Sequence, residues 1–375
     1  MDVGCWKPDQ LGPSEWDQLD RLWRRDKARN DPMFAPVLAR ELARVRDDTC
    51  IILAERAGEI RAFWSLHRRP GGWAQPISGP FSDWHGAVRS PDEKICQMEL
   101  LKHAGIGGMT AHALFPDACH PVREGLERTG AWVTDLSAGI EAFETEQKRL
   151  FPKHVKRMAS KRAKLEKATG EIEFRFDDPD PAAFDWLIGR KQQQYRATGL
   201  HNVLGSDWAS KYIRRLRGLE HDRFRCHLST LRAGGRVIAA EFNMASDTVL
   251  HGWLTAYDVE FSGASPGLLL LQDVLRAMPS RGLVRYDCGP GSGHYKHYFS
   301  NLSLPLDRGV LRTGPRAPAM ALAGTGWRHL EGTMPGGIGE VMARSRRRFD
   351  QILLSETRLA GRIGGVLDAL RRFGN

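Results

Sequence analysis

Apolar residues recur three and four positions apart near the start of the chain, and the pattern then changes to short apolar runs. The helical spacing predicts helices over Ser14–Arg29 and Phe34–Arg46. Two β-rich runs follow, Cys50–Glu55 and Ile60–His67, and the short turn between them, which contains Gly58, is typical of a hairpin. The chain is therefore expected to open with two helices and a pair of antiparallel strands.

The rest of the first half alternates between the two patterns. A loop rich in glycine, proline and tryptophan covers Arg69–Gly86. Beyond it we predict a helix over Pro91–His103, a strand over Met109–Leu114, a short helix over Val122–Arg128 and a strand over Ala131–Asp135. Strands that alternate with helices indicate a layered fold of the α/β or α+β class.

A second series of elements repeats this order. A basic helix over Pro152–Ala168 is predicted to bridge the two halves and to end at Gly170. The elements expected after it are a strand (Glu171–Phe176), two helices (Phe184–Thr198, Ser206–Leu219), a hairpin (Phe224–Leu231, Val237–Ala245), a strand (Thr248–Tyr257), a helix (Pro266–Ser280) and a strand (Leu283–Cys288). Both halves share the order helix, helix, hairpin, loop, helix, strand, which predicts a structural repeat.

These elements predict an α/β (α+β) protein of two tandem lobes, each a mixed twisted sheet flanked by helices, with a C-terminal helical tail. The first lobe is expected to cover residues 1–148 and the second residues 149–312. Residues 313–337 are rich in glycine, alanine and proline and are expected to be a linker, and helical spacing returns over 338–373, so that 313–375 forms a third region. A chain of 375 residues is long enough for two cores of ordinary size.

The composition is that of a soluble globular protein, with 41% hydrophobic and 27% charged residues. No apolar run approaches the roughly 20 residues that cross a bilayer, and Met1–Gln10 does not show the pattern of a signal peptide. The six cysteines are widely spaced, which indicates free thiols in a reducing compartment. We expect a cytoplasmic protein, with peripheral association at the inner face of the membrane as an option.

The formal net charge of +10 favours an anionic partner, which could be a phosphorylated cofactor, a nucleic acid or an acidic membrane surface. Much of this charge lies in the predicted bridging helix, and a second cluster lies at Arg344–Arg348 in the tail. The bridging helix also has an apolar face formed by Val155, Met158 and Leu165. A packed helix with a solvated basic face is therefore the simpler interpretation.

The segment most informative about chemistry is a strand that passes through a loop of small residues into a helix. Ser265 suits the N-cap of this helix, and Pro266 suits its first position. Gly263 and Gly267 let the backbone approach a bulky anion. Since a helix N-terminus presents unpaired N–H groups, the loop is a candidate site for a phosphate or a pyrophosphate, although helix capping alone also accounts for these residue types.

The residues around this loop resemble a known family. The run from Val237 to Lys296 looks like the second half of a GNAT acetyltransferase, in which a loop between a strand and a helix holds the pyrophosphate of acyl-coenzyme A. The motifs HGWLTAYD (251–258), SPGLLL (265–270), YDCGPG (286–291) and YK (295–296) are similar to those of the CelD/BcsL type of acetyltransferase. That type is related to the FemAB transferases and is associated with cellulose and exopolysaccharide biosynthesis.

The resemblance implies two tandem GNAT-like lobes, with acetyl-CoA or another acyl-CoA as the donor substrate of the second. It assigns donor binding to Ser262, Gly263, Ser265, Gly267 and Leu268. It also implies N- or O-acyl transfer to an amino or hydroxyl group of a small or lipid-linked sugar precursor of the cell envelope or an exopolysaccharide. The loop departs from the Gln/Arg-x-x-Gly-x-Gly pattern of ordinary members, so donor binding is an inference from its surroundings as well as its residues.

Transfer from a thioester needs a base for the acceptor proton and an acid for the leaving thiolate. Asp258 and Glu241 are candidates for the base, and Tyr295 is the candidate for the acid. Lys296 would hold an anionic group of the donor or the acceptor, and Asp287 ends a strand at the edge where ligands commonly bind. The residues expected to contact the acceptor are Asp83, Trp84, His85, Trp253 and Tyr257.

Two other functions are left open by the sequence. The bridging helix would suit a FemAB-like aminoacyltransferase that uses aminoacyl-tRNA on a peptidoglycan-type precursor, and nucleic acid is expected as a partner only in that case. The basic tail would suit a non-catalytic, membrane-recruited assembly protein with a degenerate GNAT fold. No metal is expected, because Asp287, Cys288, His294 and His297 lack the paired spacing of a zinc site.

Overall fold

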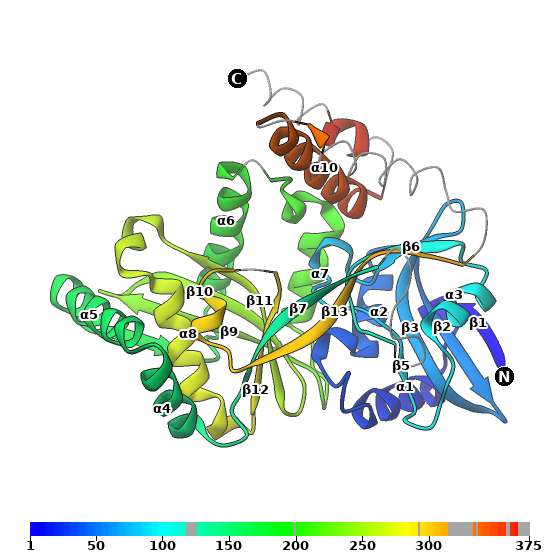
Figure 1. The fold of residues 1–375 in the computed structure, drawn as a ribbon, viewed down its shortest axis with the longest axis horizontal. Helices are drawn as coiled ribbons and strands as arrows, with labels where there is room; N and C mark the ends of the chain where they lie inside the picture. Colours follow the sequence, from blue (N-terminus) through cyan, green and yellow to red (C-terminus); the bar gives the residue numbers. More distant parts are fainter. Residues whose placement is uncertain are drawn as a thin grey trace.

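The computed structural model describes residues 1–117, 126–198, 200–291, 293–313, 333–334, 337–357 and 361–366. Two lobes lie side by side and are joined through one continuous mixed sheet (Figure 1). Helices flank this sheet in both lobes, so the predicted α/β class and the two-lobe architecture are confirmed. None of the described helices combines the length and the apolar character that a membrane span requires.

The first lobe is built around a meander that begins at the N-terminal edge of the sheet. Its helices are α1 (Pro13–Arg25), α2 (Pro36–Ala43) and α3 (Gln97–His103). Its strands are β1 (Asp2–Trp6), β2 (Thr49–Arg56), β3 (Glu59–Arg69), β4 (Trp73–Pro76), β5 (Val88–Arg89), β6 (Gly108–Leu114) and β7 (Leu126–Asp135). The hairpin predicted from the two β-rich runs is the β2–β3 pair.

The second lobe follows two helices, α4 (Ile140–Leu150) and α5 (Pro152–Thr169), the second of which is the predicted bridging helix. Its other helices are α6 (Pro181–Ala197), α7 (Asp207–Arg217) and α8 (Pro266–Ala277). Its strands are β8 (Ile172–Arg175), β9 (Arg225–Ala233), β10 (Arg236–Ala245), β11 (Val249–Tyr257), β12 (Arg285–Pro290) and β13 (Leu302–Arg312). Gly170 ends α5 with a φ of 84°, a conformation that glycine adopts without strain.

The lobes exchange their last strands. The order across the sheet is β1-β2-β3-β4-β6-β13-β7-β12-β11-β10-β9-β8. Strand β13, from the end of the second lobe, pairs with β6 of the first, and β7 of the first lobe pairs with β12 of the second. Figure 1 shows β7 and β13 running together between the lobes, and the two strands are antiparallel partners from Leu302 to Gly309. The sheet therefore has no break at the lobe boundary, and residues 302–312 belong structurally to both lobes.

Three apolar clusters cover this sheet. One extends beneath α1, α2, α6 and α7 and includes Trp23, Phe184 and Tyr212, so it is shared by both lobes. A second lies beneath α4, α5 and α8, where Leu270 is fully buried. A third lies beneath α3 in the first lobe. The first cluster, like the sheet, makes the lobes one packed unit.

Several local predictions need correction. Residues 126–128, predicted as the end of a short helix, are part of β7, where long-range pairing with β13 determines the conformation. Residues 122–125, Cys119 and His120 lie outside the described residues. The helix predicted from Pro91 begins at Gln97. Strands β1, β4, β5 and β13 and helix α4 were not predicted.

The tail helix α10 (Gly337–Ser355) lies against both lobes at its C-terminal end (Figure 1). The indole Nε1 of Trp208 in α7 donates to the Ser355 carbonyl at 2.7 Å, and Gln75 of β4 donates to the Leu353 carbonyl at 3.4 Å. The last carbonyl groups of the helix are therefore satisfied by one residue from each lobe. This end of the predicted tail is packed onto the molecule.

The shared sheet predicts that the lobes unfold together. Leu270→Ala removes buried methyl groups from the second lobe and should lower the free energy of unfolding by about 2–5 kcal/mol. We expect the urea midpoints reported by tryptophan fluorescence and by hydrogen exchange in β2 and β3 of the first lobe to fall by the same amount. A shift confined to the second lobe would show that the sheet does not couple them.

Candidate active site

The two parallel strands β11 and β12 pair only at their beginnings. Their register joins Val249 with Arg285, Leu250 with Tyr286 and His251 with Asp287, and no further pair exists along the described strands, although β11 continues to Tyr257. Strands that part in this way leave backbone N–H and C=O groups facing the gap. The gap is a natural place for an extended ligand.

A β-bulge on β11 coincides with the parting of the strands. Gly252 pairs with Asn243 of β10 and Leu254 pairs with Phe242, so Trp253 is the extra residue. A bulge bends its strand and re-aims the side chains around it. Here it turns β11 away from β12 just after His251, the last residue of the parallel pairing.

A cavity of about 540 Å³ opens in this gap. Its volume lies in the range of small-molecule sites, roughly 300–1,000 Å³. Ten of the residues predicted from the sequence line it: Asp83, Glu241, Trp253, Tyr257, Ser262, Ser265, Gly267, Leu268, Tyr295 and Lys296. All except Asp83 come from the second lobe, so the first lobe contributes one carboxylate to a site otherwise built by the second.

Glu241 is the buried carboxyl group of this cavity. Tyr286 donates its hydroxyl proton to Glu241 Oε1. Burial raises the pKa of Glu241 to about 7, although the hydrogen bond from Tyr286 acts in the opposite direction. A pKa near neutrality suits a general base.

The contact between Glu241 and Tyr286 depends on a glycine. A Cβ atom at position 252 would lie 2.1 Å from the Tyr286 hydroxyl oxygen and 3.1 Å from Glu241 Oε1. The absence of a side chain on Gly252 therefore makes room for the phenol. This is the physical reason for glycine in the HGW sequence that begins at His251.

The predicted donor loop borders the cavity. Ser265 has a φ of 55° and occupies the N-cap position of α8, but the side-chain capping bond that we predicted is not formed. Its hydroxyl oxygen instead contacts Lys161 Nζ of α5 at 2.6 Å. The N–H groups of Leu268 and Leu269 both donate to the Ser265 carbonyl. The ammonium group of Lys161 therefore adds a positive charge to a loop whose first-turn amides are partly used.

Glycines keep the loop open. A Cβ at Gly267 would meet only Tyr257 at 3.7 Å, and a Cβ at Gly263 would meet nothing within 4 Å. Gly263 does not line the main cavity but a second hollow of about 270 Å³, between the loop and Lys161 and Lys164 of α5. The loop thus has open space on both sides, and lysines line both hollows.

Tyr295 and Lys296 line the cavity at the end of β12. Burial raises the pKa of Tyr295 to about 12, so its hydroxyl is protonated at neutral pH. The ammonium of Lys296 donates to the carbonyls of Gly289 at 3.2 Å and Pro290 at 2.7 Å, and burial lowers its pKa. Lys296 therefore holds the glycine-rich turn after β12, and its remaining donor capacity faces the cavity.

Five predicted residues do not line the main cavity: Gly263, Trp84, His85, Asp258 and Asp287. Asp258 is 1% exposed, and its carboxylate accepts from Glu260 N and pairs with Arg190 and Arg236. It therefore begins the turn that leads into the donor loop. Trp84 packs against Phe115 and His251 in the core. These contacts are those of structural residues.

His85 and Asp287 are also enclosed. His85 Nε2 accepts from the backbone N–H groups of His112 and Ala113, both at 3.2 Å. Asp287 accepts two bonds from the Arg285 guanidinium, at 3.0 and 2.9 Å. Burial and the neighbouring Asp31 raise the pKa of Asp287 well above its ordinary value. Asp287 lies beside the cavity, in the layer of side chains that supports it.

Asp31, His251 and Asp287 are close enough to offer one ligand atom each to a metal ion. The cluster already contains its own cations. Arg285 pairs with Asp287, and although burial opposes it, the charge of Asp31 raises the pKa of His251 to about 10, so that the imidazole is protonated. Both ring nitrogens of His251 already contact a carboxylate of the first lobe, Asp31 or Asp83, at 3.1 Å. The arrangement is that of an ion-pair network.

The sequence comparison agrees with this geometry. Residues 152–297 match the acetyltransferase (GNAT) domain. The matched segment begins at α5 and ends just after Tyr295 and Lys296, so it contains the parted strands, the predicted donor loop and Glu241. No curated protein sequence matches the chain.

Solved structures with a related arrangement have low sequence identity to this chain. One is the C-terminal domain of a protein named as a lysylphosphatidylglycerol synthetase from Agrobacterium fabrum (13% identity, 84% of this chain and 95% of that one, TM-score 0.48). Others are FemX (10%, 73% and 90%, 0.48) and a tandem GNAT protein from the clavulanic acid biosynthesis pathway (11%, 84% and 99%, 0.45). At these identities and TM-scores the solved structures indicate no function, and we infer the function from the site and the domain match.

Among the side chains at or beside the cavity that sequence reasoning missed, three bear on its chemistry. Lys191 of α6 lines the cavity and donates to the Thr255 carbonyl at 3.1 Å, but nothing in its helical surroundings distinguished it. Tyr286 and His251 lie within the quoted motifs and were given no role. Their significance depends on Glu241 and Asp83, which are far away in the sequence, so only the fold could supply it.

The raised pKa of Glu241 predicts how stability varies with pH. Between about pH 4.5 and pH 7 the folded chain retains a proton that the unfolded chain has released, so this group's contribution is present below that range and is lost as the pH rises through it. In Glu241→Gln this loss of stability should disappear, so the urea midpoint should fall less between pH 5 and pH 8 than it does in the wild type. The exposed Glu171→Gln serves as control and should leave the difference unchanged.

Proposed function

We propose that this protein is an acyltransferase that transfers an acyl group, in the first instance acetyl, from acyl-coenzyme A to an amino or hydroxyl group of a sugar precursor. The observation that carries the proposal is the cavity between the parted strands β11 and β12. It brings together Glu241, a base of suitable pKa, the protonated Tyr295 and the loop at Ser262–Gly267 that is suited to bind an anion. All of them lie within the segment that matches the GNAT acetyltransferase domain. The acceptor class rests on resemblance to exopolysaccharide enzymes.

The donor would lie along the gap. Its diphosphate would be held at Ser262–Gly267 with the help of Lys161, and its pantetheine arm would pass the edge of β11 that faces the gap. An extended chain with amide groups can pair with a strand edge as another strand does. Its thioester would then reach the part of the cavity lined by Glu241 and Tyr295.

The chemistry follows from the protonation states of Glu241 and Tyr295. Glu241, as carboxylate, takes a proton from the acceptor amine or hydroxyl as its nitrogen or oxygen attacks the thioester carbonyl carbon. Collapse of the tetrahedral intermediate forms the amide or ester and breaks the carbon–sulfur bond. The leaving thiolate receives a hydrogen bond or a proton from the Tyr295 hydroxyl, which burial keeps protonated. The products are the acylated acceptor and coenzyme A.

An aminoacyl-tRNA donor is the second candidate, because α5 presents exposed lysines, namely Lys153, Lys156, Lys164 and Lys167. The helix also buries His154, Met158 and Leu165, and Arg162 pairs with Asp273 of α8 at the domain surface. Much of α5 is therefore explained by packing. The exposed lysines remain as candidates for tRNA binding, and a binding experiment can distinguish tRNA from coenzyme A as the donor.

Donor binding is tested by thermal stability. Coenzyme A at a hundred times its dissociation constant should stabilise the folded chain by about 2.7 kcal/mol. Lys161→Ala should weaken binding roughly tenfold or more, since a charged contact to the phosphate region is lost, whereas Lys153→Ala on the same helix should not. Stabilisation by tRNA that falls steeply with salt, with none by coenzyme A, would favour the alternative donor.

Catalysis is tested by the pH dependence of acetyl transfer. Because the base must be deprotonated, kcat/KM should rise with pH and level off above about pH 7, the pKa of Glu241. Glu241→Gln should lower the rate roughly 10²–10⁴-fold, and Tyr286→Phe should move the inflection upward because its hydrogen bond lowers that pKa. Unchanged rates in Glu241→Gln and Tyr295→Phe would place the chemistry elsewhere.

A further inference from the structure

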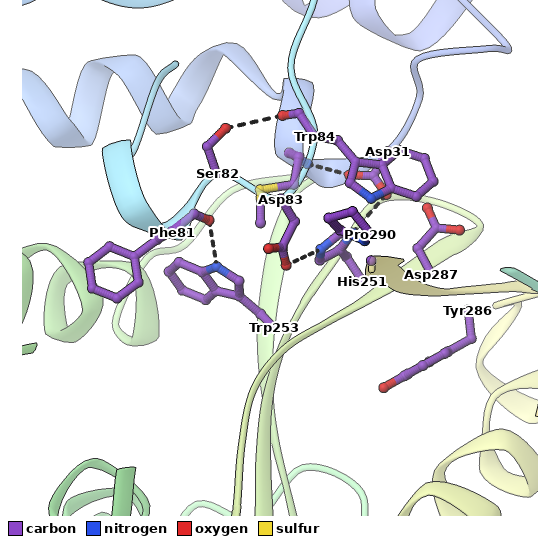
Figure 2. A network of polar contacts seen from close by, with 12 residues as sticks. Asp31, Phe81, Ser82, Asp83, Trp84, His251, Trp253, Tyr286, Asp287 and Pro290 are labelled. Atoms are coloured by element: carbon purple, nitrogen blue, oxygen red, sulfur yellow. Dashed lines mark hydrogen bonds and ion pairs between the residues drawn. The ribbon is translucent and has the colours of Figure 1, made fainter. Parts of the chain in front are cut away.

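A buried histidine connects the lobes beside the cavity. His251 is fully buried at the end of the parallel pairing, and its two ring nitrogens each contact an aspartate of the first lobe. Nδ1 lies 3.1 Å from Asp31 Oδ2, and Nε2 lies 3.1 Å from Asp83 Oδ2. Figure 2 shows the imidazole between these two carboxylates.

The two aspartates differ in their surroundings. Asp31 is fully buried, and its Oδ1 accepts the Met33 N–H at 2.7 Å, so its position is fixed by the backbone. The Asp83 side chain is about one third exposed (34%) and lines the cavity. The connection therefore runs from a rigid anchor in the first lobe, through a residue of the second, to a carboxylate at the surface of the site.

Neighbouring residues contact the imidazole and the Asp83 loop. The Trp84 ring meets His251 edge to face at 5.8 Å. Gly289 of β12 lies beside Asp83, since a Cβ at this position would be 3.4 Å from Asp83 Oδ2, an ordinary van der Waals distance. The Phe81 carbonyl accepts from Trp253 Nε1 at 2.9 Å, which ties the loop that carries Asp83 to the bulge of β11. The loop is thus attached to the second lobe at both Phe81 and Asp83.

We propose that Asp83 is the acceptor-binding carboxylate of the acyl-transfer site and that His251 and Asp31 are positioning residues that hold it in the cavity. The inference rests on the proposed acyltransferase function and deepens it. A carboxylate only accepts hydrogen bonds, so the group that Asp83 holds must carry N–H or O–H, as the amino and hydroxyl groups of a sugar do. The first lobe is then part of acceptor recognition.

A protonated imidazole suits this role. Despite the opposing effect of burial, Asp31 and Asp83 raise the pKa of His251 to about 10, so both nitrogens donate at neutral pH. Such a bridge aligns Asp83 Oδ2 with Nε2 and leaves Oδ1 for the acceptor. This resembles the use of an aspartate to orient a histidine in hydrolytic triads, with the difference that the histidine here orients a second carboxylate.

The test separates transfer from hydrolysis in the full-length chain. With acetyl-CoA as donor and glucosamine or N-acetylglucosamine as acceptor, both thiol release and acetylated sugar are measured for Asp83→Asn, His251→Gln and the double variant. Each single variant should lower kcat/KM for the sugar roughly ten- to hundredfold. Acetyl-CoA hydrolysis and the thermal shift with coenzyme A should be retained, and the double variant should be no worse than the poorer single variant, because His251 acts through Asp83.

The matched control is His67→Gln. His67 is equally buried and lies 3.1 Å from Asp48 in the first lobe, away from the cavity lining. It should lower stability without changing the ratio of transfer to hydrolysis. This control separates the loss of a buried histidine from the loss of the bridge.

Several results would overturn the inference while leaving the acyltransferase function standing. Normal sugar transfer by Asp83→Asn is one such result, and additive effects in the double variant are another. Equal losses of hydrolysis and transfer in His251→Gln would also overturn it, as would hydrolysis by the wild type without transfer to either sugar. If His251→Gln does not fold, the partly exposed Asp83→Asn still decides. A wild-type chain that neither binds coenzyme A nor cleaves acetyl-CoA would instead contradict the proposed function itself.

Discussion

The exchange of β7 and β13 is the constraint on which the site depends. Because β13 pairs with β6 and β7 pairs with β12, the position of the first lobe relative to β12 is fixed by backbone hydrogen bonds along the sheet. A carboxylate from one lobe can then be placed in the cavity of the other to within hydrogen-bonding distance. Two lobes joined only by a flexible linker would not hold Asp83 against His251, since the entropy lost in ordering them would oppose one charged contact.

The order of helices and strands was largely predictable from the sequence, because amphipathic period, turns and caps are local properties. The β2–β3 and β9–β10 hairpins and the bridging helix α5 follow from such signals. The insertion of β13 between β6 and β7 does not, because a strand's partner is decided by contacts distant in the sequence. A simple tandem repeat, with one lobe over residues 1–148 and the other over residues 149–312, was therefore the natural expectation.

The residues of the candidate site likewise divide into those that the local sequence indicates and those that only the fold identifies. The small residues of 262–267 gave a direct signal, because a loop and the helix start after it are formed by consecutive residues, whereas Tyr295 and Lys296 were chosen from the resemblance to a family. Asp258 was a reasonable candidate by type, yet two arginines from distant segments, Arg190 and Arg236, occupy its carboxylate. Conversely, His251 had no assigned role until the fold placed Asp31 and Asp83 on either side of it.

The two lobes use the same parting of parallel strands in opposite ways. In the first lobe β4 and β6 pair only at Trp73–Gly108 and Ala74–Met109. The gap beyond is filled by the lobe's own loop, since His85 N donates to the Ala113 carbonyl and the His85 carbonyl accepts from Phe115 N. Only about 10 Å³ of space remains beside Trp84 and His85, against about 540 Å³ in the second lobe. The segment that closes one cavity thus carries Asp83 into the other, which explains why Trp84 and His85 are buried while their neighbour reaches the site.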